Sequence, residues 1–180
     1  MEIPIQFRLL LKWKNIFNDL NKSPKVSISK EGKGVKSVLF LLPESIQEAK
    51  LAHYLVKVDN IEPGYTIGYV CNEKAKIFYP NSSNVKFMTY SDIDLNYFGT
   101  IKSEELLDQI KSTNYDALVD LNTNFCAATA MLAFEINSKL KIGFDSIIAN
   151  NIYTIVLEQN KEGFLESNFK MIKRLLGLRI

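Results

Sequence analysis

Along most of the chain, short runs of consecutive apolar residues alternate with segments in which apolar residues recur every three or four positions. The run SVLFLLP at 37–43 is almost continuously apolar, as is typical of a strand covered on both faces. Similar runs predict five further strands, at 65–72, 85–90, 115–122, 140–145 and 152–159. Six strands separated mostly by helices predict an α/β fold with a largely parallel sheet, right-handed crossovers and helices on both faces.

The segments between these strands carry helical spacing. A helix over 44–58 is indicated by the apolar residues Ile46, Ala49, Leu51, Leu55 and Val58. Ser103 is followed by two glutamates and predicts a helix over 103–112, because its hydroxyl can cap free amide groups and the acids favour the N-terminal end of the helix dipole. Segment 125–137 is apolar on nearly all sides and predicts a buried helix, and 163–178 predicts a closing helix.

The first 36 residues differ from the rest of the chain in charge. They hold eight Lys and Arg against three Asp and Glu, whereas the other 144 residues hold 14 against 17. This asymmetry predicts two parts: a basic amphipathic helix with a linker at 1–36, and a single α/β domain at 37–180. The linker is indicated by NKSPKVSISKEGKG, which has few large apolar residues and contains one Pro and two Gly.

An amphipathic helix is predicted over residues 5–20, with an apolar stripe formed by Leu9, Trp13, Ile16 and Leu20. Three roles are open to it: covering the core of its own domain, contacting a partner or a second copy of the chain, or lying on an anionic membrane surface. We favour packing on its own domain, because a short helix is stabilised mainly by burying its stripe.

Composition excludes several classes of protein. The 180 residues are 47% apolar, which excludes a disordered chain, and 22 Lys and Arg nearly balance 20 Asp and Glu, so we expect no nucleic-acid partner. Cys71 and Cys126 form neither a disulfide framework nor a zinc pattern. No run has the roughly 20 apolar residues of a membrane helix, and the start lacks the order of a signal peptide. We expect a cytoplasmic protein, with contact at the inner face of the membrane through residues 5–20 as an alternative.

Candidate chemistry is sought just after the strands, because ligands of open α/β sheets bind beyond the carboxyl ends. The first strand leads into PESIQE, without the glycines of a dinucleotide or phosphate loop, so we expect no nucleotide cofactor there. Asp120 and Asn122 form the best polar pair, because the carboxylate accepts and the amide both donates and accepts hydrogen bonds. The simpler alternative, which we favour, is that Asn122 or Asn124 caps the helix that begins near residue 125. No His, Cys and carboxylate residues have metal-ligand spacing, so no metal is expected.

Three other residues have simpler interpretations. Ser45 stands at a predicted helix start without the GxSxG frame of a nucleophile, so capping is preferred to catalysis. His53 is the single histidine of the chain and is interpreted as a packed or surface residue. Cys71, at a strand end, is interpreted as a structural thiol.

Four segments together resemble the family 9 glycosyltransferases, the lipopolysaccharide heptosyltransferase group. They are VLFLLPESIQEAKLAHYL, YDALVDLN, KIGFD and SNFKMIKRLLGL, which follow the family's order and spacing across residues 37–178. The resemblance implies a three-layer Rossmann-like domain, like one half of a GT-B glycosyltransferase. In that family the N-terminal half binds the acceptor and the C-terminal half binds most of the nucleotide-sugar. The resemblance therefore implies an acceptor-side domain, and we expect the C-terminal donor-binding domain to be absent.

The same resemblance implies the site residues. Alignment through Pro43 places Glu48 where the family has its catalytic Asp, the expected general base, and Gln47 where it has the preceding Gly. The side chain of Glu is one methylene longer, and a displacement of about 1 Å can lower a rate by roughly a hundredfold. The ligand-binding candidates are Ser45, Asp120, Asn122 and Asn124.

Three functions follow as hypotheses. The first is a stand-alone heptosyltransferase-like N-terminal domain that acts as a binding or interaction module, without independent catalysis. The second is the acceptor-binding subunit of a split glycosyltransferase in lipopolysaccharide or cell-envelope glycan synthesis, with a donor-domain partner chain. The third is a membrane-surface adaptor that attaches through Arg8, Lys12, Lys14 and Trp13. A homodimer is the remaining partner hypothesis.

Overall fold

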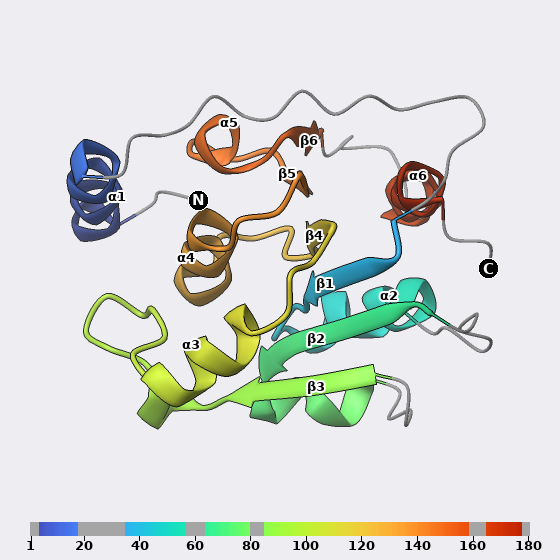
Figure 1. The fold of residues 1–180 in the computed structure, drawn as a ribbon, viewed down its shortest axis with the longest axis horizontal. Helices are drawn as coiled ribbons and strands as arrows, with labels where there is room; N and C mark the ends of the chain where they lie inside the picture. Colours follow the sequence, from blue (N-terminus) through green and yellow to red (C-terminus); the bar gives the residue numbers. More distant parts are fainter. Residues whose placement is uncertain (1–3, 18–34, 57–63, 80–84, 159–164, 178–180) are drawn as a thin grey trace.

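The computed structural model describes residues 4–17, 35–56, 64–79, 85–158 and 165–177 (Figure 1). One six-stranded sheet forms its centre. The strands are β1 (Ser37–Leu41), β2 (Thr66–Asn72), β3 (Val85–Tyr90), β4 (Ala117–Asp120), β5 (Leu140–Phe144) and β6 (Ile155–Leu157). All pairs are parallel and the order is β3-β2-β1-β4-β5-β6, so the predicted α/β, Rossmann-like fold with a parallel sheet is confirmed.

Helices cover both faces of this sheet. Val38 and Phe40 of β1 point into one apolar cluster, whereas Leu39 and Leu41 point into the other, because successive side chains of a strand alternate between faces. The first cluster is closed by α2 (Ile46–Val56), α6 (Leu165–Leu176) and the 3-10 helix η1 (Glu73–Phe78). The second is closed by α1 (Ile5–Phe17), α3 (Glu104–Lys111), α4 (Ala127–Glu135) and α5 (Ala149–Ile152). The three predicted layers are therefore present.

The predicted elements exist, with shifted boundaries. Ser103 caps α3 as expected, since its hydroxyl accepts a hydrogen bond from the amide of Leu106 at 3.4 Å. The strand predicted at 152–159 is only three residues long, because α5 ends at Ile152. Neither α5, nor η1, nor the short η2 (Asp92–Asp94) was indicated by the apolar pattern. None of the helices in the described ranges has the length and apolar character needed to cross a bilayer.

The predicted packing face of α1 is wrong. Phe7 and Leu11 are 1% and 5% exposed, whereas Leu9 and Trp13 of the predicted stripe are 61% and 60% exposed. The Phe7 ring packs edge to face against Phe125, with ring centroids 4.9 Å apart. The helix has two apolar stripes on opposite sides, since positions two apart differ by about 200°, and the Phe7 stripe faces the domain.

The role of α1 agrees with the packing interpretation, because its buried residues belong to the same cluster as Leu39 and Leu41. The side chain of Ile16 and the whole of Leu20 lie outside the described residues, as does most of the predicted linker. The division of the chain at residue 36 stays a prediction.

Candidate functional site

The sheet changes winding direction between β1 and β4. From β1 the chain enters α2 on one face, and from β4 it enters α4 on the opposite face, so the two loops diverge at neighbouring strand ends. Open parallel sheets bind ligands in the crevice at such a switch point. In this protein the switch point lies between the start of α2 and the loop 121–126, and we refer to this edge of the sheet as the crevice.

Glu48 spans this crevice from the first turn of α2. Its Oε1 accepts hydrogen bonds from the hydroxyl of Thr123 and, at 2.6 Å, from Nδ2 of Asn124. Glu48 is half-buried and Asn124 is exposed. The fold thus brings together two predicted site residues, Glu48 and Asn124, that are 76 positions apart in the sequence. Thr123 is an additional residue that the sequence pattern did not indicate.

Ser45 caps α2. The backbone amide of Glu48 donates a 3.3 Å hydrogen bond to the Ser45 hydroxyl, and the amide of Ala49 donates to the Ser45 carbonyl at 2.8 Å. The capping interpretation is confirmed. The cap fixes the first turn of α2 and with it the backbone of Glu48, while a direct ligand contact of Ser45 stays a prediction.

Asp120 lies deeper, at the end of β4, and is 4% exposed. Its Oδ1 accepts hydrogen bonds from the backbone amide and the side-chain Nδ2 of Asn122, at 3.0 and 2.8 Å, and its Oδ2 accepts one from the Tyr153 hydroxyl at 2.8 Å. Burial raises the pKa of Asp120 above its usual 3.8, although the hydrogen bonds from Asn122, Tyr153 and Thr129 act in the opposite direction. Such a carboxylate holds the loop after β4 in place.

The sequence pattern did not indicate Tyr153 as a site residue. The residue that could have pointed to it is Gly143 of the KIGFD segment. A Cβ atom built on Gly143 would lie 2.4 Å from the Tyr153 ring, so only glycine allows the ring to pack there. Burial, followed by the nearby charge of Asp120, raises the pKa of Tyr153 well above 10. The phenol therefore remains a hydrogen-bond donor to Asp120.

Neither asparagine caps the following helix, so that alternative is wrong. The cap position of α4 is occupied by Cys126, whose side chain makes no capping hydrogen bond. Nδ2 of Asn122 instead reaches Asp120 and, at 3.3 Å, Oγ1 of Thr129. The cap position lies two residues beyond Asn124, and the side-chain amides of Asn122 and Asn124 instead donate hydrogen bonds to the carboxylates of Asp120 and Glu48.

A small cavity with mixed polar and apolar lining opens beside this network. It is lined in part by Asp120, Asn122, Asp145, Ser146 and Tyr153, and its volume is about 30 Å³. A cavity needs roughly 10–15 Å³ of this kind for each water molecule. The cavity therefore has room for about two waters and not for a sugar, which leaves the outer crevice at Glu48 and Asn124 as the accessible part of the site.

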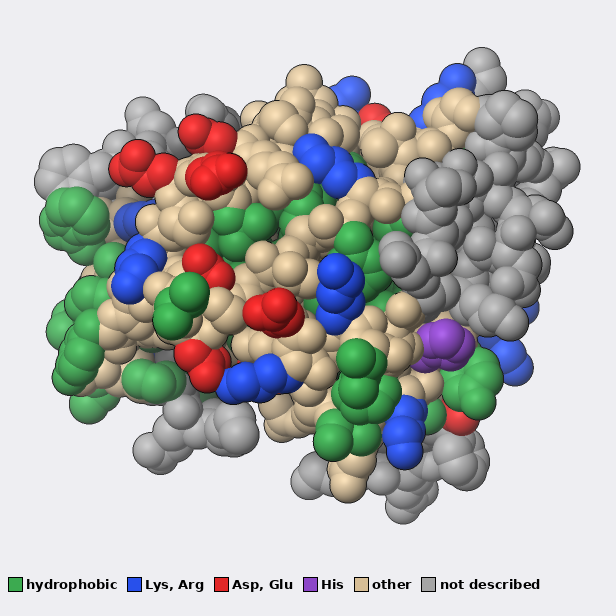
Figure 2. Space-filling model, turned by 90° about the horizontal axis from the view of Figure 1, so that it is seen from below, with side chains coloured by type: hydrophobic (Ala, Val, Ile, Leu, Met, Phe, Trp, Pro, Cys, Tyr) green, Lys and Arg blue, Asp and Glu red, His purple; other side chains and the backbone are tan. Residues whose placement is uncertain are grey.

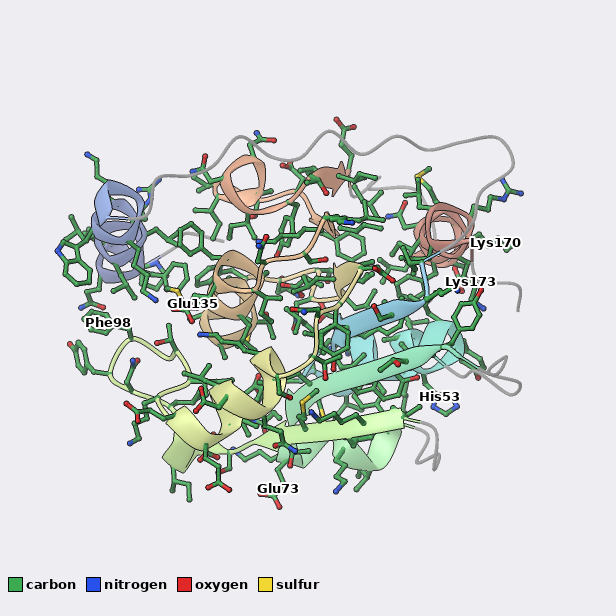
Figure 3. The ribbon with its side chains drawn as sticks, in the orientation of Figure 1. His53, Glu73, Phe98, Glu135, Lys170 and Lys173 are labelled. Carbon is green, nitrogen blue, oxygen red and sulfur yellow. The ribbon has the colours of Figure 1, made fainter. Side chains whose placement is uncertain are left out.

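The other candidates lie elsewhere or serve the fold. Nδ1 of His53 is 2.8 Å from the carbonyl of Phe78, a contact that joins α2 to the end of η1 far from α1 and Phe98 (Figure 3). Cys71 is fully buried, and burial raises its pKa to about 12, although the positive charge of Lys76 opposes the shift. Within the described ranges, no three His, Cys, Asp or Glu residues come together as a metal site.

The crevice presents a carboxylate and an amide at its surface, held by a buried network below. Glu48 can accept a hydrogen bond from a hydroxyl, and the exposed amide of Asn124 can both donate and accept. Such a pair suits a ligand rich in hydroxyl groups. The position of Glu48 in the first turn of α2 also allows proton transfer in principle, if an acceptor hydroxyl reached its carboxylate.

Solved structures of E. coli heptosyltransferase WaaC share this fold. The structure with ADP matches with a TM-score of 0.54 and 18% identity, over 79% of this chain and 48% of that one. The structure with ADP-2-deoxy-2-fluoro heptose matches with a TM-score of 0.53 and 18% identity, over 79% and 49%. This chain therefore spans about half the length of the heptosyltransferase chains and has the fold of one half of a GT-B glycosyltransferase.

No curated protein matches the chain significantly. A family model does match, over residues 11–177, which is nearly the whole chain. The chain therefore belongs to this family, which is described as a family of unknown function, DUF6913.

Proposed function

We propose that these 180 residues form a heptosyltransferase-like binding module that holds a hydroxyl-rich ligand, of the carbohydrate class, in the crevice between β1 and β4, and that they have no transferase activity of their own. The observation that carries the proposal is the Glu48 carboxylate, held across the switch point by Thr123 and Asn124. This is where open parallel sheets bind ligands, and the donor and acceptor groups match sugar hydroxyls.

Two features support binding without transfer. Both hydrogen bonds to Glu48 go to Oε1, so one oxygen of the would-be base is already engaged with the protein. In addition, glycosyl transfer depends on holding two reactants in register, and positioning supplies roughly 7–11 kcal/mol of such a barrier. The fold match covers about half of the heptosyltransferase chains, and we assign the switch point between β1 and β4 to one of the two reactants.

A second candidate function is the acceptor-binding subunit of a split glycosyltransferase in lipopolysaccharide or cell-envelope glycan synthesis. The fold shared with heptosyltransferase WaaC favours it, together with the carboxylate that Glu48 presents from the start of α2. In this case Glu48 would act as the general base, and a partner chain would supply the donor site. The two candidates differ in whether transfer appears when a partner is present.

The test is ligand binding in solution. Ligand-observed NMR with a panel of neutral and acidic methyl glycosides is expected to give saturable binding, which Glu48→Gln and Asn124→Ala each weaken at least about fivefold through a lost hydrogen bond of about 1 kcal/mol. Asp108→Asn, on the exposed side of α3, is the matched control and should bind normally. No binding by the wild type would refute the crevice as a carbohydrate site.

Activity is tested separately. The chain alone is expected to show no turnover of ADP-heptose or other nucleotide-sugars with any glycoside that binds, and turnover would overturn the non-catalytic assignment. Partners co-purified from the native cell are then added to the same assay. Turnover that requires a partner and is abolished by Glu48→Gln would establish the split-enzyme function instead.

A further inference from the structure

The outward side of α1 is an apolar surface that the domain does not cover. Ile5, Leu9 and Trp13 lie on one side of the helix at intervals of four residues, and all three are largely exposed. A groove of about 280 Å³ separates this side from the loop 96–100 and is lined by Gln6, Leu9, Leu10, Trp13 and Phe98. We refer to Ile5, Leu9, Trp13 and Phe98 as the α1 surface.

Figures 1 to 3 place this surface at one end of the molecule. Helix α1 and the loop that carries Phe98 stand together at the left edge of the ribbon (Figure 1, Figure 3). In the space-filling view from below, hydrophobic side chains gather at the same edge (Figure 2). Contiguous exposed apolar side chains of this kind mark interaction sites.

The charges beside the α1 surface are positive. Arg8 and Lys12 are exposed, each one position before a member of the apolar side, and neither makes an ion pair with a described residue. The described part of α1 contains no acidic residue. The third cation, Lys14, is bound by Glu135, which also pairs with Lys111 at 3.0 Å, so it serves the attachment of α1 to α4.

Two acidic residues before the loop, Asp92 and Asp94, are already engaged within the domain. Asp92 accepts a 2.6 Å hydrogen bond from Lys74, and Asp94 accepts hydrogen bonds from the amide and hydroxyl of Ser91 at 2.8 and 2.9 Å. Arg8 and Lys12 are therefore two exposed cations at this end that no ion pair with a described residue engages. Such cations favour an anionic partner on the other side of a contact.

This charge pattern selects one occupant. In a symmetric dimer through the α1 surface, Arg8 and Lys12 of one copy would face the same residues of the other, and like charges would repel. A bilayer with anionic lipid headgroups presents negative charge above an apolar layer, which matches cations flanking Trp, Leu and Ile on one short helix. Trp13 suits the headgroup boundary, because its ring is apolar and its indole NH is polar.

We propose that the α1 surface docks on an anionic phospholipid bilayer, with Leu9 and Trp13 at the boundary between headgroups and acyl chains and with Arg8 and Lys12 against lipid phosphates. This surface is separate from the switch-point crevice and does not rest on the carbohydrate-binding function. Docking would hold the domain at the membrane reversibly, because one 13-residue helix buries too little apolar area for permanent insertion.

The experiment uses the full chain and its own fluorescence, since Trp13 is the single tryptophan. The emission is recorded with vesicles of phosphatidylcholine alone and of phosphatidylcholine with 30 mol% phosphatidylglycerol. We expect a blue shift with the anionic vesicles only, quenching by brominated acyl chains in those vesicles, and loss of both on raising NaCl from 50 to 500 mM.

Two double variants with the same change in net charge test whether the vesicles bind at α1. Arg8→Glu with Lys12→Glu is expected to lower vesicle affinity at least about thirtyfold, since each cation near an anionic surface contributes about fivefold. Lys170→Glu with Lys173→Glu is the control on α6, at the opposite end of the molecule (Figure 3), and should bind within about threefold of wild type. Circular dichroism confirms that both are folded.

Several outcomes would overturn the proposal. One is an unchanged emission with both vesicle types. Another is an equal loss of affinity in the two double variants, which would mean that net charge and not α1 governs binding. A blue shift that depends on protein concentration without vesicles would assign the α1 surface to a second copy. The quenching by brominated lipids uses the wild-type chain, so it decides the question even if a variant fails to fold.

Discussion

The hydroxyl of Tyr153 donates a 2.8 Å hydrogen bond to Oδ2 of Asp120, across 33 residues of sequence. The ring reaches this position because it packs directly over Gly143 of β5. The same carboxylate holds Asn122, and the loop that continues to Thr123 and Asn124 meets Glu48. A buried network therefore supports the exposed crevice.

Removing the phenol should destabilise the fold through Asp120. Tyr153→Phe keeps the ring but leaves a buried carboxylate oxygen without its donor, a defect that typically costs about 1–3 kcal/mol. We expect the free energy of unfolding, measured in urea, to fall by that amount. Tyr97→Phe, at a residue 84% exposed, is the matched control and should change it by less than about 0.5 kcal/mol. Equal values for the two variants would contradict the role of the hydrogen bond.

Adding a methyl group at Gly143 should disturb the same contact. Gly143→Ala puts a Cβ where the Tyr153 ring lies, and overpacking of this kind costs about 1–3 kcal/mol. Combining it with Tyr153→Leu makes room for the methyl, so the double variant should be more stable than the sum of the single effects predicts. Strict additivity in a double-mutant cycle would show that the two residues are not coupled.

Asp120 should make stability depend on pH. Its pKa is raised by burial in the folded protein, so between 3.8 and that raised value the folded state holds a proton that the unfolded state has lost. The contribution of Asp120 to the free energy of unfolding is fully present below pH 3.8 and is lost as the pH rises through the raised pKa. Asp120→Asn removes the titration. We expect the free energy of unfolding to fall less steeply with pH above 4 in this variant, and parallel curves would refute the raised pKa.

The two thiols should differ in accessibility. Cys71 is fully buried and its pKa is raised by burial to about 12, whereas Cys126 is partly exposed. The native protein should consume at most one equivalent of Ellman's reagent, and two in guanidinium chloride. Cys126→Ser should then consume none while folded. A native reaction of Cys71 in that variant would mean that the β2 core opens readily.

The layered fold was predictable because its signal is local. The apolar run of β1 and the spacing of α2 each record burial within one element, and Ser45 and Ser103 mark helix starts through contacts three residues apart. The resemblance also placed Glu48 at the start of α2. Its partners could not be predicted in this way, since Thr123 and Asn124 are 75 and 76 positions distant and no local pattern connects them.

Sequence by itself therefore determined the order along the chain of the six strands and of the longer helices, because the period of apolar residues follows from the geometry of each element. Tertiary structure alone decided which of two apolar stripes of α1 is buried, since Phe7 meets Phe125 only after α4 is in place. It also decided that Asn122 and Asn124 serve carboxylates instead of capping α4. Both outcomes depend on contacts between distant segments, whose free energies exist only when the sheet has brought those segments together.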